Sequence, residues 1–133
     1  MAVKVLDSFA LVAYFRGEPN GLLVKELLHK AALADKPLLM TEVNYAEVKY
    51  IIIRKDGAEA WDNAAKVLET LPIEFHPVTR ALADMAADFK ARISFSLADA
   101  FAAALAKEKK ADLVTGDPEF KPLEKEIKIS WLK

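Results

Sequence analysis

The sequence has 133 residues, a formal net charge of −1 and no cysteine, and 53% of its residues are hydrophobic and 29% charged. This composition is typical of one compact domain over residues 1–133, and it excludes disulfides, thiolate metal sites and disordered or fibrous chains. No apolar run approaches the roughly 20 residues that span a bilayer, and the charges of Lys4 and Asp7 leave no signal-peptide core, so we expect a cytoplasmic protein without a membrane partner.

The first half of the chain alternates strands and helices. Residues 3–6 form a β-rich stretch, and residues 9–16 and 22–34 have the apolar spacing of helices. Residues 38–40 then predict a short apolar strand, and a helix over 41–55 follows it before the breaker Asp-Gly.

The second half continues in the same way. We predict further elements, in chain order, as a helix over 58–71, a strand over 73–75, helices over 79–92 and 96–110, and strands over 112–115 and 127–132. Residues that favour the N-cap position open three of the predicted helices, namely Thr41, Thr79 and Ser96.

Strands separated by helical segments need crossover connections, which place the strands parallel in a sheet covered by helices on both faces. We therefore predict the α/β class with a mainly parallel sheet. Ligands in open sheets of this kind bind beyond the carboxyl ends of the strands, where the strand order reverses. Asp7 ends the first strand, Asp117 follows the strand over 112–115, and Asp99 starts a helix, so we expect all three at this edge.

Four acidic residues lie where an unpaired carboxylate is costly, namely Asp7, Glu47, Asp99 and Asp117. Three of them also have an ordinary structural explanation. Asp7 can cap the helix after it, Asp99 completes the capping-box spacing Ser96-x-x-Asp99, and Asp117 lies in a Thr-Gly-Asp-Pro turn signature.

Glu47 is predicted to lie within an apolar helical stripe that contains Val43, Tyr50 and Ile51. An ion pair with a distant lysine or arginine would explain a charge at that position, and so would a bound cation. Its neighbour Glu42 lies in the first turn of the same predicted helix, where a negative charge suits the helix dipole, and we interpret it as structural.

A cation explains all four acids at once. Two unit charges about 6 Å apart repel each other by roughly 3 kcal/mol at an effective dielectric constant of 20. Four converging carboxylates would therefore strain a domain whose net stability is only about 5 to 15 kcal/mol. Oxygen ligands without cysteine or histidine favour hard ions, so the sequence predicts a Mg²⁺ or Mn²⁺ site.

The four acids lie in segments that resemble the acidic blocks of PIN-domain proteins, in their order along the chain, and in particular VapC-type toxins of prokaryotic toxin-antitoxin pairs. These segments are Val5-Leu6-Asp7-Ser8, Ala46-Glu47-Val48-Lys49-Tyr50, Ser96-Leu97-Ala98-Asp99-Ala100 and Leu113-Val114-Thr115-Gly116-Asp117-Pro118-Glu119-Phe120. The resemblance covers nearly the whole chain. It implies a three-layer α/β/α sandwich around a parallel sheet of four or five strands.

The resemblance also implies which residues form the site. The metal-binding acids of the family map onto the four acids above, with Thr115 and Ser8 as polar helpers. The implied activity is endoribonuclease hydrolysis of RNA, in which Mg²⁺ or Mn²⁺ activates a water molecule. Neither His29 nor His76 lies near an acidic block, so no side chain is assigned as a general base, and both histidines are expected to be structural or exposed.

The partners implied by the resemblance are an RNA substrate, a cognate VapB-like antitoxin and a second copy of the chain in a homodimer. The antitoxin would lie in an apolar groove near the acids. Candidate residues for that groove are Phe9, Leu11, Val12, Tyr14 and Phe15, although residues at this spacing more often form the core.

Two other functions remain open from the sequence. The chain could be a non-catalytic RNA- or protein-binding module of PIN-like fold in which the acids hold a structural ion. It could also be a phosphoryl-transfer domain of the receiver or phosphatase type. The second fits poorly, because Phe9 stands where the phosphatase Asp-x-Asp pattern needs its second acid, and there is no glycine-rich phosphate loop.

Overall fold

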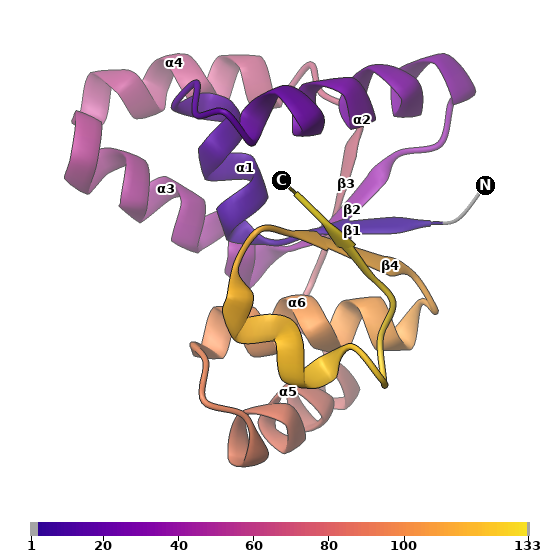
Figure 1. Cartoon of the computed structure of the whole chain (residues 1–133). Coiled ribbons are helices and arrows are strands. Elements are labelled where there is room, and N and C mark those ends of the chain that lie inside the picture. Colours follow the sequence, from indigo (N-terminus) through magenta and orange to yellow (C-terminus); the bar gives the residue numbers. More distant parts are fainter. Residues whose placement is uncertain (1–2, 133) are drawn as a thin grey trace.

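A computed structural model describes residues 3–132 and shows a five-stranded sheet between two layers of helices (Figure 1). The strands are β1 (Lys4–Leu6), β2 (Leu38–Thr41), β3 (Ile73–His76), β4 (Asp112–Thr115) and β5 (Ile129–Trp131). Their order is β3-β2-β1-β4-β5, and every neighbouring pair is parallel. The predicted α/β class, parallel sheet and three-layer arrangement are therefore confirmed.

The helices are α1 (Ser8–Phe15), α2 (Gly21–Ala34), α3 (Glu42–Asp56), α4 (Ala58–Leu68), α5 (Arg80–Arg92), α6 (Leu97–Glu108) and the 3₁₀ helix η1 (Pro118–Leu123). Helices α1 to α4 cover one face of the sheet, and α5, α6 and η1 cover the other (Figure 1). Within residues 3–132, no helix is long and apolar enough to cross a bilayer.

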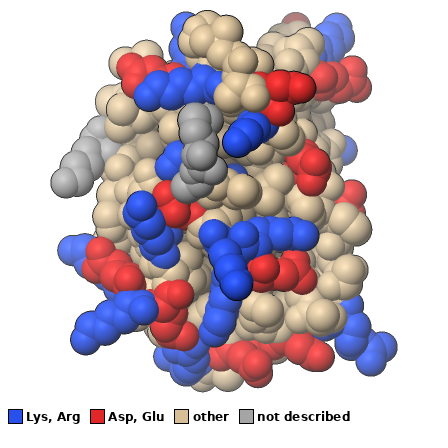
Figure 2. Space-filling view, turned by 90° about the vertical axis from the view of Figure 1, so that its right-hand side faces the viewer, with Lys and Arg blue, Asp and Glu red and all other residues tan. Residues whose placement is uncertain are grey.

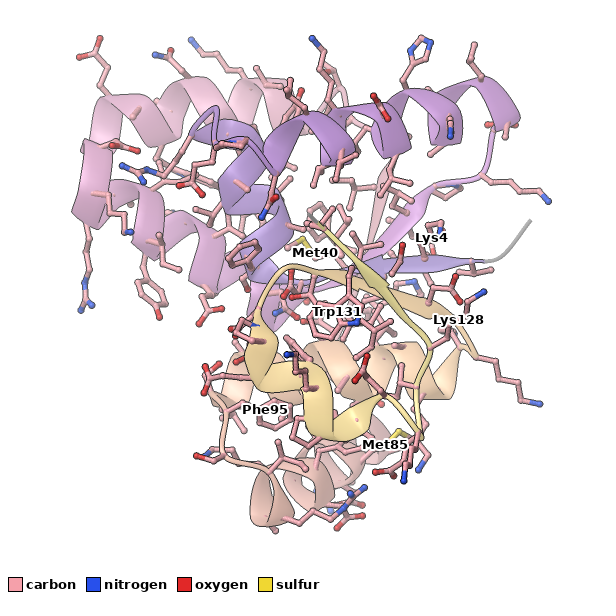
Figure 3. The ribbon with its side chains drawn as sticks, in the orientation of Figure 1. Lys4, Met40, Met85, Phe95, Lys128 and Trp131 are labelled. Atoms are coloured by element: carbon pink, nitrogen blue, oxygen red, sulfur yellow. The ribbon has the colours of Figure 1, made fainter. Side chains whose placement is uncertain are left out.

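Each face of the sheet carries its own core. Met40 of β2 packs with residues of α1, α3 and α4, whereas Phe95 and Met85 belong to the core on the opposite face (Figure 3). Helix α6 lies at the centre of that second core, because the nine consecutive residues 98–106 are all buried. Six of the nine are alanine, and their small side chains let the helix approach the sheet closely while exposing only its two ends.

The predicted helix starts are confirmed more closely than the helix ends. Thr41, Thr79 and Ser96 each accept a hydrogen bond at the N-cap of α3, α5 and α6. Helices α4 and α6 end two or three residues before the predicted positions, and β5 is shorter than the predicted strand over 127–132. The 3₁₀ helix η1 was not predicted. Its first residue is a proline, and the segment that contains the cap of η1 was interpreted only as a turn.

The strand order reverses between β1 and β4. From β1 the chain adds β2 and then β3 on one side, and it later adds β4 and β5 on the other. Leu6 pairs with Val114, so the residues that follow these two strands leave the sheet side by side. The carboxyl edge of β1 and β4 is therefore the position at which an open parallel sheet forms a binding site.

Candidate metal centre

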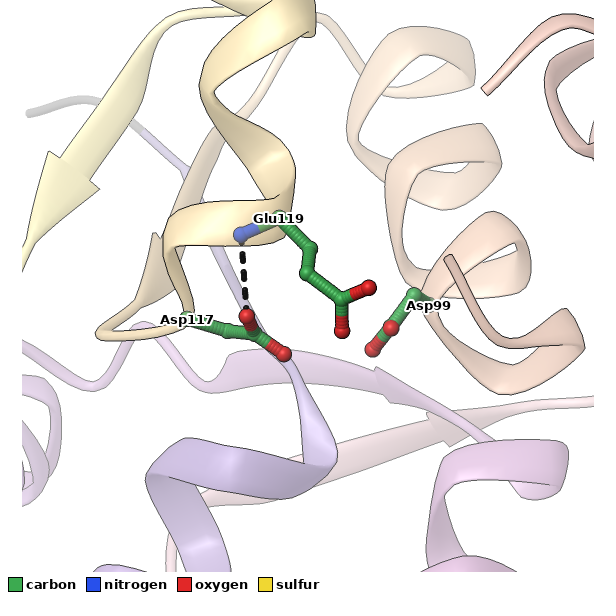
Figure 4. Close-up of side chains that lie close together, drawn as sticks. All are labelled: Asp99, Asp117 and Glu119. Atoms are coloured by element: carbon green, nitrogen blue, oxygen red, sulfur yellow. Dashed lines mark hydrogen bonds between the residues drawn. The ribbon is translucent and has the colours of Figure 1, made fainter. Parts of the chain in front are cut away.

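Three acidic side chains converge beyond the carboxyl edge of β1 and β4. One carboxylate oxygen from each of Asp99, Asp117 and Glu119 lies within 4.8 Å of the others, and the side chains point toward one another (Figure 4). Oxygens that share one Mg²⁺ at about 2.1 Å can be at most about 4.2 Å apart. Only a small side-chain adjustment therefore separates this arrangement from a coordination sphere, and we refer to these residues as the acidic triad.

Asp7 is completely buried and lies close enough to the acidic triad for the charges of Asp99 and Asp117 to act on it. As the N-cap of α1, it accepts a hydrogen bond from the backbone N–H of Ala10 at 2.8 Å, and its other oxygen accepts one from the hydroxyl of Thr115. Burial raises the pKa of Asp7 from 3.8 to about 8. The two hydrogen bonds lower it, and the charges of Asp99 and Asp117 raise it further. The buried carboxylate therefore lacks a counter-charge.

Thr115 connects two of the predicted acids. Its hydroxyl donates to Asp7 and accepts a hydrogen bond from the backbone N–H of Asp117 at 3.0 Å. Asp117 in turn accepts from the backbone N–H of Glu119 at 2.9 Å, as the cap of η1. A single hydroxyl thus fixes the orientation of the Asp7 carboxylate and the path of the loop that carries Asp117.

Asp99 both caps a helix and belongs to the acidic triad. Its carboxylate accepts from the backbone N–H of Ser96 at 3.2 Å, and the Ser96 hydroxyl accepts from the backbone N–H of Asp99, which completes the predicted capping box. Burial raises the pKa of Asp99 to about 6, the hydrogen bonds with Ser96 lower it, and the charges of Asp117 and Glu47 raise it. The same Asp99 carboxylate therefore caps α6 and takes part in the acidic cluster.

Glu47 lies at the side of the site, and its predicted surroundings were partly wrong. The buried stripe of α3 consists of Asn44, Val48 and Ile52, one residue away from the predicted stripe, and Tyr50 is 47% exposed. Glu47 is consequently half-buried and needs no buried ion pair. Its carboxylate accepts a hydrogen bond from the Tyr50 hydroxyl at 3.3 Å, and no ion pair to it occurs among residues 3–132.

A buried amide that the sequence did not single out joins the segments carrying three of the acids. Asn44 is 0% exposed, and its Nδ2 donates to Ser8 Oγ at 2.9 Å and to the carbonyl of Ala98 at 3.1 Å. Its Oδ1 accepts from the hydroxyl of Thr41. Ser8 follows Asp7 and Ala98 precedes Asp99 in the sequence, so this amide sets the spacing of α1, α3 and α6 at the site.

The donor set fits a hard divalent cation. The converging groups are carboxylates, and burial and mutual repulsion raise the pKa of both Asp7 and Asp99, which means that their negative charge is incompletely compensated. A divalent cation bound by oxygen ligands would supply the missing positive charge. Hydrogen bonds from backbone N–H groups offset part of the cost in its absence.

The remaining predicted residues lie further from the acidic triad. Ser8 is buried, and its hydroxyl donates to the backbone carbonyl of Asn44 and accepts from the side-chain amide of the same residue. Glu42 is exposed in the first turn of α3, as interpreted from the sequence. His29 is exposed, and His76 ends β3 with its Nε2 2.7 Å from a Glu74 oxygen. Glu119 was overlooked because an exposed acid in a turn is normally solvated, although its spacing of two from Asp117 was a usable signal.

The candidate groove residues divide between core and surface. Leu11 and Val12 are buried in the core beneath α3 and α4, and Tyr14 and Phe15 are partly buried with their ring centroids 5.2 Å apart. Phe9 is 37% exposed. These five residues therefore do not line one continuous open groove.

A cavity of about 840 Å³ lies at the opposite, amino-terminal edge of the sheet, and none of the candidate acids lines it. Lys4 and Lys128 both approach the carboxylate of Asp112, at 3.4 and 3.8 Å. They lie toward the right-hand side of Figure 3, and the view onto that side shows basic and acidic residues interspersed (Figure 2). Lysines therefore line this cavity together with Asp112, whereas the converging carboxylates lie at the carboxyl edge.

Comparison with known proteins agrees with this geometry. The family model of the PIN domain matches residues 4–126. No curated protein matches the sequence. Among solved structures, the chain is similar to VapBC2 from Rickettsia felis bound to a promoter DNA fragment, with a TM-score of 0.76, 14% identity, and coverage of 98% of this chain and 99% of that one.

Two further structures show the same fold. DNA-bound VapBC from Salmonella typhimurium matches with a TM-score of 0.74 and 13% identity over 100% of both chains. VapC20 from Mycobacterium tuberculosis, a toxin that cleaves the sarcin-ricin loop, matches with a TM-score of 0.62 and 19% identity over 83% of this chain and 86% of that one. Because the family model spans nearly the whole sequence, the chain belongs to the PIN domain family.

Proposed function

We propose that this protein is a Mg²⁺- or Mn²⁺-dependent endoribonuclease that hydrolyses RNA phosphodiester bonds. The observation that carries the proposal is the acidic triad of Asp99, Asp117 and Glu119 near the buried carboxylate of Asp7, at the switch point of a PIN-family sheet. A bound divalent ion would lower the pKa of a water molecule and stabilise charge on the departing oxygen.

The proposed metal ligands are Asp7, Glu47, Asp99 and Asp117, and the geometry adds Glu119 to this group. Glu47 belongs with them because its charge contributes to the raised pKa of Asp99. Thr115 is proposed to hold Asp7 and Asp117 in position through its two hydrogen bonds. A protein that presents only carboxylates to the ion leaves its remaining coordination positions to water and to phosphate oxygens.

We further propose that the protein acts as the toxin of a toxin-antitoxin pair, with a VapB-like antitoxin and a second copy of the chain as partners. Support comes from the VapBC complexes of Rickettsia felis and Salmonella typhimurium, which share the fold over nearly the full length. The similarity to a toxin that cleaves the sarcin-ricin loop supports RNA as the substrate class.

Cleavage of labelled RNA by the purified protein tests the catalytic proposal. We expect cleavage with millimolar Mn²⁺ or Mg²⁺ and none with EDTA. Asp7→Asn and Asp99→Asn should each reduce the rate more than about 100-fold, since even residues that only orient metal ligands contribute about 10- to 100-fold. Asparagine at position 99 can still accept the Ser96 N–H, so the cap of α6 is retained.

Asp62→Asn is the matched control, because Asp62 is an exposed acid on α4 away from the site. It should cleave at the wild-type rate. An Asp7→Asn protein that cleaves RNA as fast as the wild type would exclude the nuclease proposal. A wild-type protein that is stabilised by Mn²⁺ but cleaves no RNA would instead identify a non-catalytic metal-binding module.

A further inference from the structure

A partly exposed aromatic ring lies beside the loop that carries Asp117. Phe9 lies two residues after Asp7 in the first turn of α1 and is 37% exposed. About a third of this side chain therefore remains accessible to a ligand at the edge of the acidic site. Residue 9 follows the carboxyl end of β1, the position where the acids gather.

The ring is held firmly in this position. A Cβ atom placed on Gly116 would lie only 2.5 Å from Cε1 and 3.0 Å from Cζ of Phe9, so the ring edge rests directly on the Gly116 backbone. The side-chain amide of Asn20 packs against the same glycine, because its Nδ2 would lie 3.1 Å from that Cβ atom. Gly116 lies between Thr115 and Asp117, so the Phe9 ring is fixed directly beside the loop that carries the acids.

The Phe9 ring also takes part in no other aromatic contact. Of the large hydrophobic side chains exposed within residues 3–132, only Phe9 and Tyr50 are aromatic. The Tyr50 ring is covered by the guanidinium of Arg54, whose Cζ lies 5.2 Å from the ring centroid. Over the same residues, no aromatic ring or cation stacks on Phe9.

We infer that Phe9 is a stacking platform for an RNA base adjacent to the bond that is cleaved. This inference rests on the proposed nuclease function and extends it to how the substrate is positioned. Unpaired bases stack on aromatic side chains, and such stacking tolerates many base identities because every base has a flat face. Because Gly116 precedes Asp117, a base on this ring would have its neighbouring phosphate close to the acidic triad. Single-stranded or looped RNA is therefore the substrate form that fits the site, since a base within a duplex cannot reach the ring.

The test measures cleavage of a single-stranded RNA by Phe9 variants in Mn²⁺. Stacking of one base on an aromatic ring corresponds to about 5- to 150-fold in affinity. We expect Phe9→Ala to raise KM within this range, Phe9→Trp to retain the wild-type value, and Phe9→Leu to resemble alanine although it still covers Gly116. Leu33→Ala is the matched control, because Leu33 is an exposed apolar residue at the far end of α2.

A substrate with a single abasic nucleotide distinguishes stacking from a change in structure. With the wild-type protein, removing one base beside the cleaved bond should raise KM about as much as Phe9→Ala does. With Phe9→Ala, removing the same base should have less than about a two-fold further effect, because the two changes remove one interaction. Phe9→Ala should lower the melting temperature by removing the contact with Gly116, but the rise in melting temperature on adding Mn²⁺ should be the same for wild type and variant, since the ring binds no metal.

Three results would overturn the inference. The first is a KM of Phe9→Ala within about two-fold of the wild-type value. The second is an effect of Phe9→Ala on KM that adds in full to the effect of the abasic nucleotide, wherever that nucleotide is placed. The third is a Phe9→Ala protein that cleaves normally and is weakened only in binding an inhibitory protein. In each case wild-type cleavage would show that the nuclease proposal still holds. Failure of the wild type itself to cleave RNA would remove both.

Discussion

Replacing Asp7 by asparagine should stabilise the metal-free protein. Asp7 is 0% exposed, and burial raises its pKa from 3.8 to about 8. The folded protein therefore keeps a proton at pH 7 that the unfolded chain has released. Below a pH of 3.8, which is the ordinary pKa of an aspartate, the buried carboxyl causes no destabilisation. Above it, each further pH unit lowers the free energy of unfolding by about 1.4 kcal/mol, which amounts to about 4 kcal/mol at pH 7. The loss levels off above about pH 8, where the folded protein also releases the proton.

Urea unfolding in EDTA at several pH values measures this effect. The Asp7→Asn protein should be more stable than the wild type by about 2 to 4 kcal/mol at pH 7, allowing for a weaker hydrogen bond with Thr115, and about equally stable at pH 4. Mn²⁺ at about 100 times its Kd should add about 2.7 kcal/mol to the wild type and much less to the variant. A variant that is no more stable than the wild type at pH 7, or a difference independent of pH, would refute the reasoning.

Three other substitutions test the remaining parts of the site. Glu119→Gln should weaken Mn²⁺ binding about 10-fold or more in calorimetry. Glu108→Gln, at the exposed end of α6, is the control and should bind Mn²⁺ as the wild type does. If Glu119→Gln binds Mn²⁺ as tightly as the wild type, Glu119 is not a ligand. Asn44→Ala should lower the free energy of unfolding in urea by about 2 to 4 kcal/mol, because two buried hydrogen-bonding partners lose their donor; a loss below about 1 kcal/mol would contradict this role. Thr115→Val removes a hydrogen bond that lowers the pKa of Asp7, so Mn²⁺ binding should shift to higher pH, and an unchanged pH profile would argue against it.

The alternation of strands and helices was readable from the sequence because its signals are local. The strand over 112–115 has the predicted bounds, and the caps Thr41, Thr79 and Ser96 are hydrogen-bonded as expected. Helix ends were less accurate, since no residue enforces a stop within the predicted tails of α4 and α6. The 3₁₀ helix η1 has no apolar periodicity over its six residues, so the sequence indicated only the Thr-Gly-Asp-Pro turn at its start.

The site was only partly readable, because its geometry depends on contacts between distant segments. Asp7, Asp99 and Asp117 follow or precede regular elements, and the predicted topology brings those positions to one edge. Glu119 and Asn44 carried no such local mark. In the sequence, Glu119 resembles any solvated acid on a turn, and Asn44 resembles any polar residue in the first turn of a helix. Their roles become visible only in the folded protein, where Glu119 approaches Asp99 of α6 and Asn44 donates to the carbonyl of Ala98.

For three of the acids, the structural and the metal-binding interpretations are compatible. Asp7, Asp99 and Asp117 each accept a backbone N–H hydrogen bond at a helix start. The carboxylates of Asp99 and Asp117 still converge, and their charges act on Asp7. The caps hold each carboxylate in a fixed direction, and the positive ends of α1 and α6 offset part of the repulsion. The sheet topology then brings the helix starts together, because α1 follows β1 and η1 follows β4 at the point where strand order reverses. A fold that uses its helix caps in this way can assemble a cation site before the cation arrives, so metal binding should reorganise the backbone very little.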